Sequence, residues 1–358
     1  MRRVIITGSG HFLPDNIIDN SYFLNHTFYD EAGAKIEKSN EEIISKFHEI
    51  TEIEERRYVD EDMNNSDIAT IAGQRALEDA GVNKEELDYV MVATNYGDID
   101  KHGAADVMPS ISARVKYKMQ IKNNQCRPYD MNFGCPGWVE AVILGSQLIK
   151  AGLAEKILVI GSDTLSRATD PFDRTAMIFA DGAGAVVLEA KETDEECGVM
   201  NFVTLSDNQD EIHYLNNGVS LNTDYDGAYK SISMKGRKVY EFALKKVPAA
   251  IKRVIEQGGK DIADIDKILL HQANAKMDHA MIARLFKLFG KTEIPKGIDP
   301  MTVQKFGNSS VATVPTMYDL IAKRQLGDHE FHPGNTIIFA SVGAGMNINA
   351  LMYKFPEK

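Results

Sequence analysis

Cysteine is scarce in this chain of 358 residues, which contains only three cysteines and one tryptophan. The odd number of cysteines argues against a disulfide framework. The positions of Cys126, Cys135 and Cys197 do not have the spacing of metal ligands, which argues against a structural zinc site. A reducing cytoplasm fits this composition best, so we expect a cytoplasmic protein that binds no metal.

Long hydrophobic runs and an excess of basic residues are also missing. No stretch reaches about 18 uninterrupted apolar residues, which excludes a membrane-spanning helix. Gly8 and Gly10 interrupt the first apolar run too early for a signal peptide. The formal net charge of −12 argues against nucleic acid as the main partner, and an acidic partner would need a local basic patch.

The order of the hydrophobic segments predicts an α/β fold. Strand-like runs at residues 3–7, 89–93 and 157–160 alternate with helical patterns such as the one at 136–151. This alternation is typical of sheets covered by helices. Residues 14–57 are polar and charged, and we expect them to form an excursion that covers one face.

The sequence also contains internal repeats. Residues 133–135 (Phe-Gly-Cys) and 306–308 (Phe-Gly-Asn) each open a long apolar helical segment that leads to a short strand. Two further pairs of similar segments follow the same order: residues 77–93 with 255–271, and Gly-Ala-Gly at 182–184 with 343–345. We interpret Gly182-Ala-Gly184 as a close-packed turn before a strand rather than as a phosphate-binding loop.

These repeats predict two sibling halves, residues 1–190 and 197–358, separated by a polar run. The first half carries Cys135 and the second carries Asn308 in the matching place. If the halves pack around a pseudo-two-fold axis, the two side chains face one cavity.

Three residues at these places are candidates for chemistry. Cys135 precedes Pro136 at a helix start, where free N–H groups and the helix dipole favour a thiolate nucleophile; a small buried residue is the alternative. His271 ends the apolar strand 268–270 and is either an acid–base group or a structural histidine. Asn308 is either a functional amide or a helix N-cap. Together they suit acyl transfer, in which the thiolate takes an acyl group and neutral His and Asn donate hydrogen bonds to an enolate-like carbonyl.

Three motifs surround these residues, at 132–137 (Asn-Phe-Gly-Cys-Pro-Gly), 271–274 (His-Gln-Ala-Asn) and 306–310 (Phe-Gly-Asn-Ser-Ser). With them the chain resembles beta-ketoacyl-ACP synthase III, a condensing enzyme of the thiolase fold. The resemblance implies an α/β, thiolase-like fold whose two duplicated αβ halves form a layered αβαβα core. Supporting matches span nearly the whole chain, at 161–163, 170–174, 181–185 and 234–236.

The resemblance also implies a role for each candidate. Cys135 would be acylated by an acyl-CoA primer, and His271 and Asn308 would promote decarboxylation of malonyl-ACP. The backbone N–H groups of Cys135 and Ala344 would form the oxyanion hole. The product is a 3-ketoacyl-ACP that initiates fatty-acid synthesis, and the reaction needs no cofactor beyond its substrates.

Four further positions are assigned by the same resemblance. Arg174 matches a residue that binds the CoA adenine, although the tryptophan that usually stacks there has no clear match. Lys276 stands where an arginine is common near the tunnel mouth, and Val342 replaces a bulky aromatic. Met108 corresponds to a residue that limits the acyl pocket from across a homodimer interface. These departures keep open a primer other than acetyl, or a related condensing enzyme of a specialised lipid or polyketide pathway.

Basic residues follow His271 in a protein that is otherwise acidic. We expect Lys276, Arg284 and Lys287 to form the patch that receives the acidic acyl carrier protein; a solvated helix face is the alternative. Two further readings remain open, a cysteine acyl hydrolase and a non-catalytic partner subunit.

Overall fold

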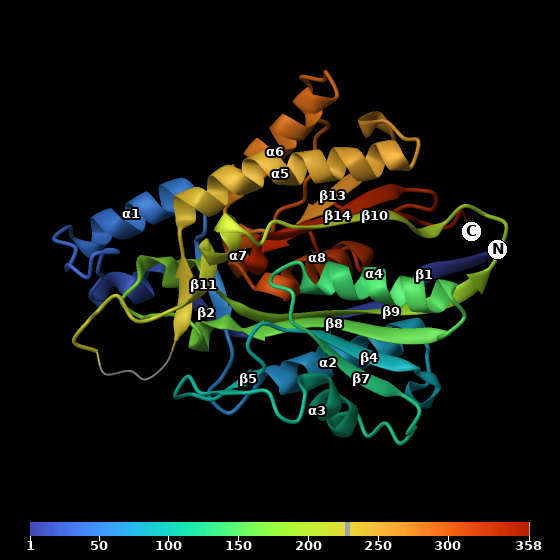
Figure 1. Ribbon diagram of the computed structural model, residues 1–358, viewed down its shortest axis with the longest axis horizontal. Helices are drawn as coiled ribbons and strands as arrows, with labels where there is room; N and C mark the ends of the chain where they lie inside the picture. The colour runs from blue at the N-terminus through green and yellow to red at the C-terminus, as the bar shows by residue number, and fades with distance from the viewer. Residues whose placement is uncertain (226–229, 358) are drawn as a thin grey trace.

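The computed structural model describes residues 1–225 and 230–357, which form five alternating layers of helices and sheets (Figure 1). This arrangement confirms the predicted αβαβα layering. Residues 226–229 and 358, which belong to the predicted second half, lie outside the described residues.

The first sheet has five strands from the N-terminal part of the chain. β4 runs parallel to its neighbours β7 and β8, whereas β9 runs antiparallel to β8 and to β1. In spatial order the strands are β1 (Arg2–Phe12), β9 (Asp181–Glu192), β8 (Lys156–Thr164), β4 (Tyr89–Ala93) and β7 (Arg127–Met131).

The second sheet repeats this plan with four assigned strands. β13 is parallel to β14, and β15 is antiparallel to both β14 and β10. Beside β13, where the first sheet has β7, the Ile268 N–H donates to the Ile298 carbonyl over 2.7 Å. The strands in order are β10 (Gly198–Ser206), β15 (Asn347–Lys354), β14 (Thr336–Gly343) and β13 (Lys267–Leu270).

Helices occupy the remaining three layers. α4 (Gly137–Lys150) and α8 (Thr313–Ala322) lie between the two sheets (Figure 1). The outer face of the first sheet carries α2 (Asn65–Ala80) and α3 (Ile111–Lys118), and that of the second carries α5 (Gly236–Gln257) and α6 (Ala275–Leu288).

Side-chain alternation along the central strands explains the layering. On β8, Ile157 and Val159 face the middle layer, whereas Leu158 and Ile160 face α2. β14 alternates in the same way between the middle layer and the helices α5 and α6. Because both faces are covered, the central residues 157–160 of β8 and 337–340 of β14 are all apolar.

Shorter elements cover one end of the layers. The predicted excursion within residues 14–57 is present as a separate apolar cluster around Phe23, Phe28 and Ile43. Its elements are β2 (Asn16–Asp19), the 3-10 turn η1 (Asn20–Asn25), α1 (Asn40–Thr51) and β3 (Glu55–Tyr58). The other short strands and helix are β5 (Asp98–Ile99), β6 (Ala105–Asp106), the paired β11 (Leu215–Gly218) and β12 (Ser231–Met234), and α7 (Val303–Phe306). Further 3-10 turns are η2 (Lys84–Glu86), η3 (Leu165–Arg167), η4 (Arg174–Ile178), η5 (Asp210–His213), η6 (Ile262–Asp264), η7 (Ser310–Ala312) and η8 (Ala344–Met346).

Two local predictions are wrong. Gly182-Ala-Gly184 lies inside β9 rather than in a turn, because β9 must pass close to α8: a Cβ on Gly184 would stand 2.6 Å from the Thr316 nitrogen. Asn308 does not open a long helix directly. It follows α7, and η7 intervenes before α8 begins at Thr313.

The chain passes from the first sheet to the second between Glu192 and Gly198. The division into halves at 1–190 and 197–358 stays a prediction. Within the described residues, no helix combines the length and the apolar character needed to cross a membrane.

Candidate active site

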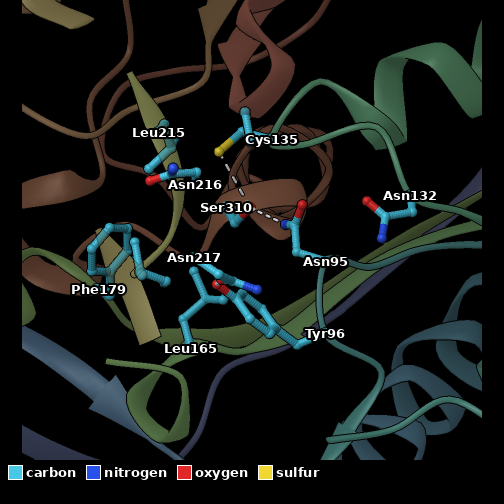
Figure 2. A pocket seen from close by; sticks show the side chains of 12 residues that line it. Asn95, Tyr96, Asn132, Cys135, Leu165, Phe179, Leu215, Asn216, Asn217 and Ser310 are labelled. Carbon is cyan, nitrogen blue, oxygen red and sulfur yellow. Dashed lines mark hydrogen bonds between the residues drawn. The ribbon is translucent and has the colours of Figure 1, made fainter. Parts of the chain in front are cut away.

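Cys135 stands at the start of α4, immediately before the N-cap residue Pro136. Its partly buried thiol lines a cavity of about 210 Å³ (Figure 2). The preceding Gly134 has φ of +69°, and a Cβ there would lie 2.7 Å from the Ala344 nitrogen. Glycine is therefore required for two reasons: the backbone turn has a positive φ, and a second backbone segment approaches closely.

That second backbone is the end of β14. A Cβ on Gly343 would lie 2.5 Å from the Cys135 nitrogen, so the two backbone segments are in direct contact. Cys135 and Ala344 both line the cavity. The structure thus brings together the two residues whose N–H groups were predicted to form an oxyanion hole.

Ser310 connects the predicted catalytic residues, and the sequence reasoning missed it. Its hydroxyl donates to the Cys135 sulfur over 3.4 Å, and its N–H donates to Asn308 Oδ1 over 2.8 Å. Its backbone also acts on the imidazole of His271, whose pKa it raises. Ser310 adopts φ of +53°, an uncommon conformation for serine, and in it the residue bonds both Cys135 and Asn308. A signal was available, because Ser310 lies inside the same motif as Asn308.

His271 lies at the end of β13, where its N–H donates to the Ala340 carbonyl over 2.8 Å. Its side chain is buried, and Nδ1 has no hydrogen-bond partner among the described residues. Burial lowers the pKa of His271 to about 4, against the opposing effect of the Ser310 backbone. The imidazole is therefore neutral near pH 7 and retains an unused nitrogen.

Asn308 is held by backbone contacts on both sides. Its N–H donates to Ile178 and its carbonyl accepts from Ala180, which fixes it against the first half. Because Oδ1 accepts the Ser310 N–H, the amide NH₂ is the group left to donate elsewhere.

A buried carboxylate network supports Ser310 from the first half. Asn95 Nδ2 donates both to Asp163 Oδ2 over 2.6 Å and to Ser310 Oγ over 2.8 Å. Asp163 also accepts from Thr94 and from the Asn95 N–H. Asp163 accepts only, so it orients the Asn95 amide with NH₂ toward Ser310, leaving the serine hydroxyl to point at the sulfur. The sequence reasoning missed Asn95 as well, although it follows buried β4 much as His271 follows β13.

The electrostatics of the thiol differ from the sequence-based expectation. Burial raises the pKa of Cys135 to about 11, the hydrogen bond from Ser310 opposes this, and the charge of Asp163 adds to it. Desolvation thus outweighs the helix start, and the resting cysteine is a neutral thiol. Burial also raises the pKa of Asp163 to about 6, against its hydrogen bonds from Asn95.

The remaining predicted residues are not among those that line the cavity. Arg174 in η4 and the α6 residues Lys276, Arg284 and Lys287 are exposed, and none of the four forms a salt bridge within the described part of the chain. Val342 is buried in the core beside α5 and α6 and does not line the cavity.

Two other predicted features do not contribute to the cavity of this chain. Met108 is 84% exposed and is not among the lining residues. The only tryptophan, Trp138, is 1% exposed inside the middle layer, so it is not available to stack on an adenine.

A layered αβαβα fold that directs a cysteine at a helix start toward a histidine and an asparagine from the other half defines a condensing enzyme of the acyltransferase class. Family models for 3-oxoacyl-[acyl-carrier-protein] synthase III match residues 129–208, and those for its C-terminal part match residues 255–355. The chain belongs to the beta-ketoacyl-[acyl-carrier-protein] synthase III family.

Individual relatives match along the whole length. The synthase III of Paracoccus denitrificans is 31% identical over 97% of both chains, and that of Clostridium acetobutylicum is 33% identical over 100% of both. Among solved structures, the synthase III of Thermus thermophilus superposes with a TM-score of 0.79 at 27% identity, covering 99% of this chain and 100% of that one. The predicted family and its thiolase-like fold are confirmed.

Proposed function

We propose that the protein condenses an acyl-CoA primer with malonyl-ACP, with loss of CO₂, and so initiates fatty-acid synthesis with a 3-ketoacyl-ACP. The observation that carries this proposal is the junction at Ser310, which hydrogen-bonds both Cys135 and Asn308 and whose backbone raises the pKa of the His271 imidazole against the effect of burial. Cys135 and Ser310 line the cavity, whereas His271 and Asn308 adjoin Ser310 without lining it. A nucleophile beside two neutral hydrogen-bond donors suits thioester chemistry.

In the first half-reaction, the Cys135 sulfur attacks the thioester carbonyl of the primer. The carbonyl oxygen becomes negative, and the N–H groups of Cys135 and Ala344 stabilise it. When the carbonyl re-forms, the CoA thiolate leaves and takes up the proton that the cysteine thiol has lost. Ser310 favours this step because its hydroxyl donates to the developing thiolate.

In the second half-reaction, malonyl-ACP loses CO₂ and the electrons of the broken carbon–carbon bond form an enolate. Neutral His271 and the free NH₂ of Asn308 donate hydrogen bonds to the enolate oxygen. The enolate carbon then attacks the acyl-cysteine, a new carbon–carbon bond forms, and the Cys135 thiolate is released. Loss of CO₂ drives the step, so the proposed chemistry calls for no metal or redox cofactor.

We assign the carriers to the exposed basic residues. Arg174 and Lys276 bind the CoA portion of the primer, and Arg284 and Lys287 on α6 dock the acyl carrier protein. The exposure of these cations in a chain of net charge −12 supports this assignment. Reversing both charges, Arg284→Glu with Lys287→Glu, raises KM for malonyl-ACP much more than KM for the primer; equal effects would reject the docking site.

The protein is proposed to act as a cytoplasmic homodimer. β7 is an edge strand of the first sheet, and Tyr129 on it is 50% exposed. On neighbouring segments, Tyr117 is 76% exposed and Met108 84% exposed. An open edge beside exposed aromatic side chains is typical of an interface between copies. Sedimentation of the purified protein as a monomer at micromolar concentration would disprove the dimer.

One sequential assay tests the function. The protein is incubated with acyl-CoAs, a thioester on Cys135 is sought by intact mass, and malonyl-ACP is then added. We expect acylation followed by a 3-ketoacyl-ACP. Release of free acid alone would identify a hydrolase, and no acylation from any donor would indicate a partner subunit. The same assay with primers of specialised pathways decides whether that alternative holds.

A further inference from the structure

The inner face of the second sheet, which packs on α4, is polar at one end. Asn347 and Asn349 lie on the same face of β15 as Leu351, whose side chain belongs to the middle layer. On β10, Ser206 stands opposite Asn347. Thr204 stands opposite Asn349 in the same way. Buried amides are costly unless they are hydrogen-bonded, so the partners of the two asparagines show what each one holds in place.

The two asparagines bind different parts of the chain at the start of α4. Asn349 Nδ2 donates to Glu140 Oε2 over 2.7 Å, inside the first turn of the helix. Asn347 Nδ2 instead binds backbone. It donates to the carbonyl of Ala344 over 3.1 Å and to the carbonyl of Phe133 over 3.4 Å. A single amide thus bridges the end of β14 and the segment that leads into α4.

The orientation of the Asn347 amide follows from its three partners. Carbonyl oxygens can only accept hydrogen bonds, so the NH₂ group must face Phe133 and Ala344. Oδ1 then faces the Ser206 hydroxyl, which donates to it over 2.6 Å. The fit is close, because a Cβ on Gly345 would lie 2.8 Å from Nδ2. All the hydrogen-bonding groups of this amide therefore point at fixed partners.

The turn beside Asn347 has an uncommon backbone conformation. Gly345 and Met346 both have positive φ, +74° and +46°. The second value is uncommon for a residue other than glycine, and such a conformation persists only where the surrounding contacts determine it. Asn347 binds the Ala344 carbonyl, and Asn208 Nδ2 donates to the Gly345 carbonyl over 3.0 Å. The position of Ala344, directly before the turn, therefore depends on these side chains.

We propose that Asn347 is a positioning residue for acyl transfer: it holds the backbone of Cys135 and of Ala344 at the spacing at which both N–H groups bind one thioester oxygen. This inference rests on the proposed function and adds a residue to it. Asn347 does not line the cavity, so it acts through the two backbone segments without touching the substrate. The donors of an oxyanion hole must be in place before the charge develops, and a misplacement of about 1 Å slows a reaction by about 10².

Two reactions of the same sulfur separate positioning from general damage. Acylation by acetyl-CoA passes through a negatively charged oxygen, whereas iodoacetamide is attacked at a saturated carbon that loses iodide, and no oxyanion forms. Both reactions consume the Cys135 thiolate, so their ratio cancels any change in the thiol pKa. Single-turnover acylation at saturating acetyl-CoA and the rate of alkylation are each followed by intact mass.

The expected result is a selective loss of acylation. In Asn347→Ala the maximal acylation rate falls about 10- to 100-fold, because the two oxyanion donors lose their spacing. The rate of alkylation and the KM for acetyl-CoA each change by less than about threefold, since neither depends on the oxyanion. Asn347→Leu, which keeps about the same side-chain volume, lowers the ratio as much and replaces Asn347→Ala if that variant fails to fold.

Two variants of neighbouring residues make the result specific. Asn349→Ala is the matched control: it removes a buried amide from the same face of β15 but touches neither carbonyl, so the ratio stays at its wild-type value. Ser206→Ala leaves Asn347 in place but frees Oδ1, and we expect it to lower the ratio about threefold, the effect of one weak hydrogen bond. Ser206→Ala also tests the proposal if neither Asn347 variant folds.

Several results would overturn the proposal. Equal losses of acylation and alkylation in Asn347→Ala would mean that Asn347 only supports the fold around the sulfur. An unchanged ratio in the Asn347 variants, or an equal drop in Asn349→Ala, would reject the positioning role and leave the proposed function intact. A wild-type protein that iodoacetamide alkylates but no acyl-CoA acylates would instead remove the proposed function and this inference with it.

Discussion

The two central helices occupy corresponding places in the fold, but the chain reaches them differently. Cys135 comes directly before the N-cap of α4, so the nucleophile stands at the helix end. Asn308 is separated from α8 by η7, and this extra turn carries Ser310 across to the first half. The repeated framework supplies a shared cavity, and the unequal approaches to it supply unlike chemical groups.

The comparison predicts that the groups before α4 and the groups before α8 can be inactivated separately. The largest effect is expected for Cys135, which stands before α4. Cys135→Ala abolishes acylation by any primer, because neither other thiol is accessible: Cys126 is 1% exposed and Cys197 is not exposed. Intact mass after incubation with acyl-CoA measures this. Cys126→Ala serves as the control and remains acylated. Acylation persisting in Cys135→Ala would move the nucleophile elsewhere.

The second prediction concerns the other half. His271→Ala lowers the rate of condensation by roughly 10²–10³, because a hydrogen bond to the enolate is lost. Acylation changes by less than about threefold, since a primer needs no decarboxylation. Single-turnover measurements of the two steps distinguish them. His279→Ala, on the exposed side of α6, is the matched control, and equal loss of both steps in His271→Ala would contradict the division.

The third prediction tests the contact between the two backbones. Gly343→Ala places a methyl group 2.5 Å from the Cys135 nitrogen and displaces the oxyanion donors. We expect acylation to slow about 10²-fold, the usual cost of losing one such donor. The control is Gly236→Ala, where an added Cβ has no neighbour within 4 Å. Normal acylation in Gly343→Ala would exclude Ala344 from the oxyanion hole.

The smallest effect is expected for substitution of Ser310, which connects Cys135 to the segment before α8. Because the pKa of Cys135 is raised to about 11, the thiolate fraction falls about tenfold for each pH unit below that value. Alkylation by iodoacetamide therefore increases with pH throughout the range 7 to 10. Ser310→Ala removes the donor to sulfur, raises the pKa further and slows alkylation at pH 8 by about tenfold.

Two observations would contradict this last prediction. An alkylation rate that already levels off near pH 7 would mean that the thiol is ionised in the resting enzyme. A Ser310→Ala rate equal to that of the control Ser309→Ala would mean that the hydrogen bond at 3.4 Å does not influence the sulfur.

Much of the fold followed from the sequence because its signals are local and repeated. Strands buried on both faces appear as apolar runs, and Cys135 before Pro136 identifies a helix start. Ser310 and Asn95 were missed because their contacts join distant parts of the chain: 215 residues separate Asn95 from Ser310, and 175 separate Ser310 from Cys135. The prediction of a turn at 182–184 was wrong for a related reason. The glycines allow the neighbouring helix α8 to approach closely, and no local pattern in the sequence reveals that helix. The sequence favoured a thiolate at Cys135, whereas its pKa in the structure is raised, because the burial that raises it depends on the whole fold.

The close contacts made by glycines have a consequence for how substrates arrive. Gly161 and Gly184 bring the first sheet against η7 and α8, and a Cβ on either would lie within 2.2 or 2.6 Å of backbone atoms there. Because these contacts leave no free space between the packed elements, the two sheets cannot separate by a hinge motion. The entry of thioesters must instead depend on small movements of side chains and surface segments.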